Sequence, residues 1–166
     1  MQVDIELKGL TGVLETLKSL PREVVSKRGG PVRAALRKGA VVIQKQEIAN
    51  LRAVIANTKD GAKAESTGLL LKNVIVSRGK APSGGNGERF LVRIKRKTYA
   101  RKGGKPVTTL KTAQILEYGS VKQPAEPWIR PAFLSKATEA IHTVENELVK
   151  AIDRVVKRLA QANKGK

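Results

Sequence analysis

Cysteine is absent from this chain of 166 residues, and histidine occurs once, at position 142. A chain without cysteine has no disulfide framework, no zinc ribbon and no thiol nucleophile. Transition-metal sites need several nitrogen or sulfur ligands, and His142 follows Ile141 in an expected helix, where a solvated or packed side chain is the ordinary role. There is no nucleophile-elbow pattern either. We therefore expect no enzymatic activity, no metal and no cofactor.

Aromatic residues make up only 3% of the chain, whereas 40% of its residues are hydrophobic. The interior must therefore be built from Leu, Ile, Val and Ala, largely on helices. No window approaches the ~20 apolar residues that a membrane-spanning helix needs, and the first residues lack the basic and then apolar pattern of a signal peptide. We expect a soluble protein made in the cytoplasm, folded as a single domain over residues 1–166, with no membrane partner.

Acidic residues are also scarce, since 14 of them stand against 33 Lys and Arg, a net charge of +19. Eleven basic residues lie between Arg78 and Lys111, where the only acid is Glu88. This local excess indicates a polyanionic partner, either nucleic acid or an acidic protein surface. The candidate contact residues are Arg93, Lys95, Arg96, Lys97, Arg101, Lys102 and Lys105.

Three interpretations of this basic segment stay open: docking onto acidic protein neighbours, contact with DNA, or a solvated surface that keeps the protein soluble. Proteins that bind single strands present exposed aromatic rings on which bases stack. The segment offers only Phe90 and Tyr99, and Phe90 is in phase with the core face of its expected strand. Contact with DNA would therefore be made to the backbone, blind to sequence and strongly dependent on salt.

Apolar residues at helical spacing predict two long helices. Pro31 suits the first turn of the earlier one, which should run to about residue 56 as the spine of the domain, with its heptad spacing forming a core face rather than a coiled-coil seam. Its apolar residues are Ala34, Leu36, Val41, Ile43, Ile48, Leu51 and Ile55. The later helix should run from near residue 131 to about 162 and leave a frayed tail over 163–166. A short helix over residues 11–20 is expected before both.

Alternation of apolar and polar residues predicts strands at residues 3–7, 74–76 and 90–94. The last two pair most simply as a hairpin through a flexible glycine-rich loop at about 79–88. This loop lacks a G-K-S/T sequence and a following helix, so it does not predict nucleotide binding. A second basic loop covers about 97–108, and residues 109–118 can be helix or strand.

The fold class that follows is α+β. It consists of a small antiparallel sheet packed against a long central helix and a long C-terminal helix, with extended basic glycine-rich loops.

The stretch from Ile115 to Phe133 organises the rest of the chain. Three prolines with fixed φ, at positions 124, 127 and 131, make it extended and unsuited to helix or central strand. It presents one indole, Trp128, which is either an anchor of the fold or a contact between subunits. We expect this segment to fix the final helix against the sheet, with Arg130 bracing it through Glu117 or a backbone carbonyl.

The same stretch resembles the closing motif of a family of tail components from long-tailed phages. The resemblance rests on the sequences E-Y-G-S at 117–120 and P-A-E-P-W-I-R-P-A-F at 124–133, followed by a final helix. A T-G-L-L step at 67–70 before a β-branched run, and the opening strand and L-x-x-L-x-x-L-P pattern, are similar as well. The motif residues are Glu117, Tyr118, Gly119, Pro127, Trp128, Arg130, Pro131 and Phe133.

Members of that family are tail-completion or head–tail joining proteins of the phage neck. The resemblance implies a small α+β subunit without enzymatic activity that acts in a homo-oligomeric ring, six subunits by analogy. Its partners would be neighbouring neck and tail proteins and, in the channel, DNA. The protein would be found in the virion after assembly in the host cytoplasm. The alternatives are a tail-terminator or head-completion role in the same neck, or a non-specific nucleic-acid-binding protein.

Overall fold

The computed structural model describes residues 30–57, 67–80, 87–99 and 106–164. Two long helices dominate this part of the chain, α2 (Pro31–Asn57) and α6 (Ile129–Lys164). The shorter elements between them are α4 (Leu69–Lys72), β1 (Val74–Arg78), β2 (Phe90–Ile94) and α5 (Thr109–Tyr118). The architecture is α+β, as the sequence predicts.

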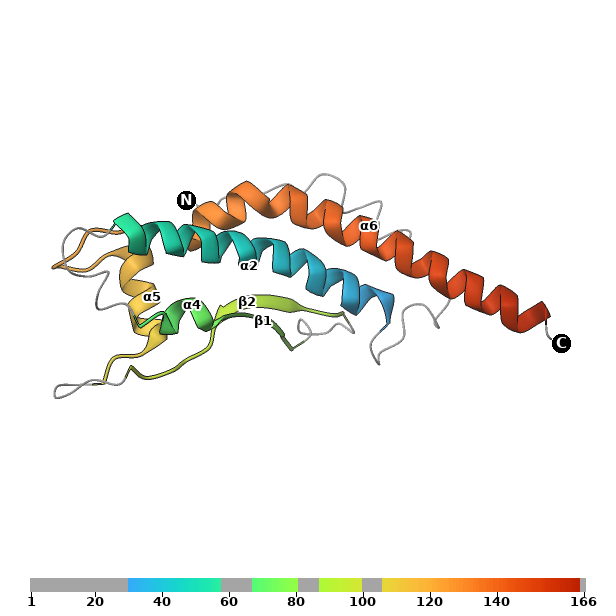
Figure 1. Ribbon diagram of the computed structural model, residues 1–166, viewed down its shortest axis with the longest axis horizontal. Coiled ribbons are helices and arrows are strands. Elements are labelled where there is room, and N and C mark those ends of the chain that lie inside the picture. The colour runs from blue at the N-terminus through green and yellow to red at the C-terminus, as the bar shows by residue number, and fades with distance from the viewer. Residues whose placement is uncertain (1–29, 58–66, 81–86, 100–105, 165–166) are drawn as a thin grey trace.

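The elements form layers around α2 (Figure 1). The β1–β2 hairpin lies along one side of α2, and α6 runs antiparallel to α2 along the other side. The C-terminal part of α6 projects beyond the first turn of α2, so the molecule is elongated. Helix α2 is thus the spine that the apolar spacing predicts, and it lies between α6 and the hairpin.

The two long helices approach closely at Gly39, which is buried. A Cβ atom at this position would lie 2.5 Å from Val144 Cγ2 and 2.9 Å from the Ala140 carbonyl oxygen. Both distances are shorter than van der Waals contact, so only glycine allows this helix separation. The crossing therefore depends on the absence of a side chain at one residue of α2.

The hairpin is antiparallel, with Val74 opposite Ile94 and Val76 opposite Val92. This pairing confirms the expected hairpin. Val74 is 2% exposed, and Val92 and Ile94 pack against the same core. The opposite face of the ribbon carries Arg93, because side chains alternate along a strand.

The centre of the core lies where α2, α4, β1, α5 and the segment before α6 meet. Its buried members are Leu51, Leu70, Val74, Ala113 and Trp128. Trp128 is the largest of them and is fully buried. The Trp128 segment therefore joins the start of α6 to the helices and the strand around it, which identifies Trp128 as an anchor of the fold.

Several boundaries differ from the sequence-based expectations. Helix α6 begins at Ile129, before Pro131, and continues to Lys164, so residues 163 and 164 are helical rather than frayed. Residues 109–118 are helical, which resolves that ambiguity. Ala34, expected in the core, is exposed, because the buried positions of α2 are Ala35, Gly39, Glu47 and Leu51.

The segment expected as a second flexible loop, 97–108, is partly paired. Thr98 and Thr108 form an antiparallel bridge, and Tyr99 N donates to Val107 O at 2.9 Å. The expected strand at 3–7 and helix at 11–20 lie outside the described residues, as does most of the loop at 79–88.

Candidate functional site: the junction between α5 and α6

A single carboxylate, that of Glu117 at the end of α5, caps the first turn of α6. Its Oε2 accepts hydrogen bonds from the backbone N–H groups of Trp128 at 2.8 Å and Ile129 at 2.9 Å. Its Oε1 accepts from Arg130 N at 3.2 Å. The first N–H groups of a helix have no partner within the helix, and the next residue, Pro131, has no N–H. One side chain thus accepts hydrogen bonds from these otherwise unpaired N–H groups and places negative charge at the positive end of the helix dipole.

The hydrogen bonds of this buried carboxylate determine its charge state. Glu117 is only 2% exposed. Burial, the largest single influence, raises the pKa of Glu117, but hydrogen bonds from Ile129, Trp128 and Arg130 together lower it below its ordinary value. The carboxylate is therefore charged over the whole neutral range, as a cap of a helix N-terminus requires.

Arg130 braces the junction from the surface. Its Nε donates to Glu117 Oε1 at 3.4 Å, which matches one of the two expected partners. Its guanidinium carbon also lies 5.4 Å from the centre of the Tyr118 ring. Both partners of this cation–π contact are largely exposed, with Tyr118 at 70%, so its contribution to stability is small.

Gly119 turns the chain back toward the core after α5. Its φ is +79°, a region that favours glycine, and its N–H donates to Ile115 O at 2.8 Å. A Cβ atom there would lie 2.9 Å from Ala125 N. The returning segment is fixed by Glu126 N, which donates to Leu116 O at 2.8 Å. The glycine two residues after Glu117 is therefore needed for the chain to return to the carboxylate.

Helix α2 completes the junction from the other side. Asn50 Nδ2 donates to Trp128 O at 3.1 Å, and Gln46 Nε2 donates to Asn50 Oδ1 at 2.8 Å. The Trp128 indole Nε1 is buried, with no hydrogen-bond partner among the described residues. The indole is thus held by packing and its backbone by polar contacts.

Glu47 is a functional group that the sequence analysis did not identify. It is 6% exposed, and burial, with the charge of Glu117 as a second cause, raises its pKa to about 7. The signal was present in the sequence, because Glu47 is four residues from both Ile43 and Leu51 and so lies within the apolar stripe of α2. The junction therefore contains two buried carboxyl groups with opposite pKa shifts.

The remaining motif residues lie outside the hydrogen-bonded contacts of the junction. Pro127 and Pro131 are exposed, whereas Phe133 is 40% exposed and lines a cavity of about 260 Å³ between α2 and α6. Among the described residues of this lining the charged group is Glu145, whose Oε2 lies 3.1 Å from His142 Nδ1. His142 itself is an exposed side chain.

The basic candidates are less closely held. Arg93, Lys95, Arg96 and Lys97 are exposed, while residues 101, 102 and 105 lie outside the described part of the chain. Thr109, fully buried at the start of α5, fixes the backbone here, since its hydroxyl donates to Lys95 O at 2.8 Å and its N–H to Lys97 O at 2.8 Å. The backbone that carries the charges is thus anchored, while the charged side chains are exposed.

Comparison with models of protein families, with curated proteins and with solved structures finds no match for this chain. Within the described ranges no helix is long and apolar enough to cross a membrane. The same residues contain no group of three or more His, Cys, Asp or Glu side chains that could hold a metal ion.

Proposed function

We propose that this protein is a structural component of a phage neck, a subunit of a homo-oligomeric ring that completes the tail and helps join it to the head. The observation that carries the proposal is the α5–α6 junction. The residues of the motif that resembles the phage family, Glu117, Gly119, Trp128 and Arg130, act together there as one unit.

The shape of the molecule also supports a role in assembly. The tip that follows α5 projects at one end, with Tyr118 70% exposed and Val121 fully exposed. Large exposed apolar groups at the end of an elongated subunit suit a contact with a neighbour. Contact between two different surfaces of identical subunits generates a closed ring when the rotation closes. Six subunits are proposed on the family resemblance alone.

Two other functions compete with this proposal. A tail-terminator or head-completion protein would occupy the same neck and use the same kind of subunit. A free-standing nucleic-acid-binding protein would account for the net charge of +19 without a ring. Loss of a tail-terminator or head-completion protein would lead to the accumulation of different particles. Loss of a free-standing nucleic-acid-binding protein would leave the particles normal.

The deciding experiment removes the gene from the encoding phage and images the lysate by electron microscopy. We expect full heads beside unattached tails with abnormal ends, and restoration of joined particles when the wild-type protein is supplied in trans. Purified protein measured by mass photometry should contain a closed oligomer. Normal virions in the lysate would refute the proposal, and a monomer that leaves particles unaffected would favour the nucleic-acid-binding alternative.

A further inference from the structure

The fully exposed side chains on the outer face of the β1–β2 hairpin are all basic. Arg93 lies opposite Ile75 in the register, so both face away from the core side that carries Val74 and Val92. Leu91 shares this outer face. Ile75 and Leu91 are half-buried, whereas Arg89, Arg93 and Lys95 are exposed. The accessible part of this face is therefore cationic.

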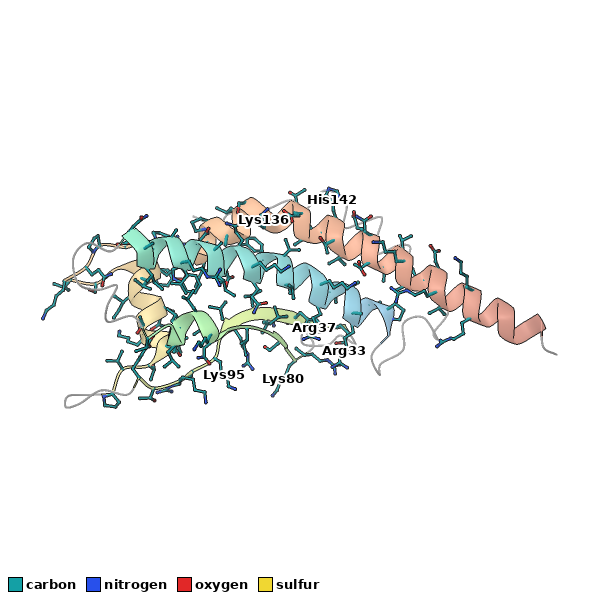
Figure 2. The ribbon with its side chains drawn as sticks, viewed as in Figure 1. Arg33, Arg37, Lys80, Lys95, Lys136 and His142 are labelled. Atoms are coloured by element: carbon teal, nitrogen blue, oxygen red, sulfur yellow. The ribbon has the colours of Figure 1, made fainter. Side chains whose placement is uncertain are left out.

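Helix α2 extends the same charge. Arg33 and Arg37 are exposed, one helical turn apart, and no acidic residue occurs from Pro31 to Gln46. Figure 2 shows Arg33, Arg37, Lys80 and Lys95 projecting on the sheet side of the molecule, with Lys136 and His142 on the opposite side along α6. We name the group on the sheet side the basic face: Arg33, Arg37, Lys80, Arg89, Arg93 and Lys95.

Acidic side chains do not neutralise this face within the described residues. Glu88 is the only acid of the hairpin region, and its carboxylate is taken by Arg78, with Nε at 2.8 Å. The acids of α6 are engaged elsewhere. Glu147 pairs with Lys38 and Lys150, and Glu139 with Lys136. The cations of the basic face are thus without a described ion pair, whereas Lys38, Lys136 and Lys150 around α6 are paired.

We propose that the basic face binds the phosphate backbone of double-stranded DNA without reading its sequence. Alternate residues of a strand are ~6.6 Å apart, and Arg33 and Arg37 are separated by ~6 Å along α2. The charges thus form a spaced row that can follow a line of phosphates. Contacts of this kind position a protein on a duplex and carry no sequence information.

Two observations favour a duplex backbone over other polyanions. A protein–protein interface usually has an apolar centre with a polar rim, whereas the fully exposed side chains of this face are all basic and its apolar residues, Ile75 and Leu91, are half-buried. A single strand is usually held by stacking on exposed aromatic rings. The basic face contains no aromatic residue: Phe90 lines the cavity between α2 and α6, and the exposed ring of Tyr118 lies on α5, outside this face. This inference does not depend on the neck assignment, because DNA binding can be measured on the purified protein.

The test measures binding of the full-length protein to a fluorescent 30-base-pair duplex of arbitrary sequence, by anisotropy at several salt concentrations. One variant carries Arg89→Gln, Arg93→Gln and Lys95→Gln, and a second carries Arg33→Gln and Arg37→Gln. We expect each to weaken binding at least ~10-fold near 0.1 M salt and to reduce the slope of log K against log salt by ~0.9 for each phosphate that the protein no longer neutralises. Scrambling the duplex sequence should leave the affinity unchanged.

The matched control removes three cations from α6, with Lys136→Gln, Lys150→Gln and Arg154→Gln. It has the same net charge as the first variant, so it should retain most of the affinity if the basic face is the site. Unchanged thermal melting of all variants establishes that they fold. Equal weakening in the control, tighter binding to a single strand of the same length, or tighter binding to an acidic polypeptide than to duplex DNA would each overturn the proposal.

Discussion

The α5–α6 junction and the basic face are built on opposite principles. At the junction, charge is buried and held by hydrogen bonds, as with Glu117 and the three N–H groups of α6. On the basic face, charge is exposed and unpaired among the described residues, as with Arg93 and Lys95. The first region therefore determines the shape of the molecule, whereas the second is accessible on its surface. Substitutions should affect stability at the junction and binding at the basic face.

The largest effect is expected from Trp128→Ala. Trp128 is fully buried in the core, and deletion of a large aromatic side chain from a core costs ~3–5 kcal/mol of stability. Thermal or urea unfolding followed by circular dichroism would measure this loss. Substituting the exposed Leu134 by Ala provides the control, with little change expected. An unchanged melting curve for Trp128→Ala would contradict the role of the indole as an anchor of the core and remove the distinction between the two regions.

The next effect concerns the pH dependence of stability and Glu47. Its pKa is about 7 in the folded protein against 4.5 for the free group, so the folded state binds more protons between these values. Stability should therefore fall as pH rises from 5 to 8, by up to about 3 kcal/mol at ~1.4 kcal/mol per pKa unit.

The variant Glu47→Gln, which resembles the protonated form, should remove most of this fall and be more stable than the wild type at pH 8. Urea unfolding at several pH values measures the trend. A wild-type stability that does not change between pH 5 and 8 would contradict the shifted pKa. The exposed Glu139→Gln is the matched control and should leave the profile unchanged.

A smaller loss, about 2 kcal/mol, is expected from Glu117→Ala, because three N–H groups at the start of α6 lose their acceptor. The pKa of Glu117 is lowered, so its stabilising effect should be present at neutral pH and be lost as pH falls through the folded pKa.

Hydrogen exchange should locate the damage from Glu117→Ala at the first turn of α6. The same variant removes one cause of the raised pKa of Glu47, so the fall in stability between pH 5 and 8 should become shallower. Protection of Ile129 and Arg130 equal to that in the wild type would show that the cap contributes nothing.

The smallest effect on stability is expected from Tyr118→Ala, below ~0.5 kcal/mol, because the ring is exposed and its contact with Arg130 lies at the surface. If Tyr118 contributes to the proposed ring, the variant should lose oligomer in mass photometry while its melting curve stays unchanged. An intact oligomer would indicate that the subunit contact does not involve Tyr118. The result decides whether the junction also contributes to the proposed contact between subunits.

Much of the fold could be predicted because its signals are local. Proline at position 31 and the apolar spacing predicted α2, and alternation predicted the hairpin and its core face, including Phe90 and Val92. The predicted start of α6 was too late, since the cap comes from Glu117 in another helix rather than from a residue beside Ile129. No local pattern carries that information.

The functional regions were predictable to different degrees. The family resemblance brought attention to Glu117, Gly119, Trp128 and Arg130, although it did not reveal that one carboxylate serves three donors. The charge count pointed to residues after Arg93 but not to Arg33 and Arg37, which join them only when α2 folds beside the hairpin. Glu47 was overlooked because a carboxyl group in an apolar stripe looks like a break in the pattern.

The shared cap separates the tip after α5 from the direction of α6. Glu117 and the residues it binds, Trp128 to Arg130, close a loop whose two ends are fixed to each other. The tip between them, from Ser120 to Pro124, projects outward and leaves the direction of α6 unaffected. Substitutions or insertions within this tip should therefore leave the scaffold beneath it in place.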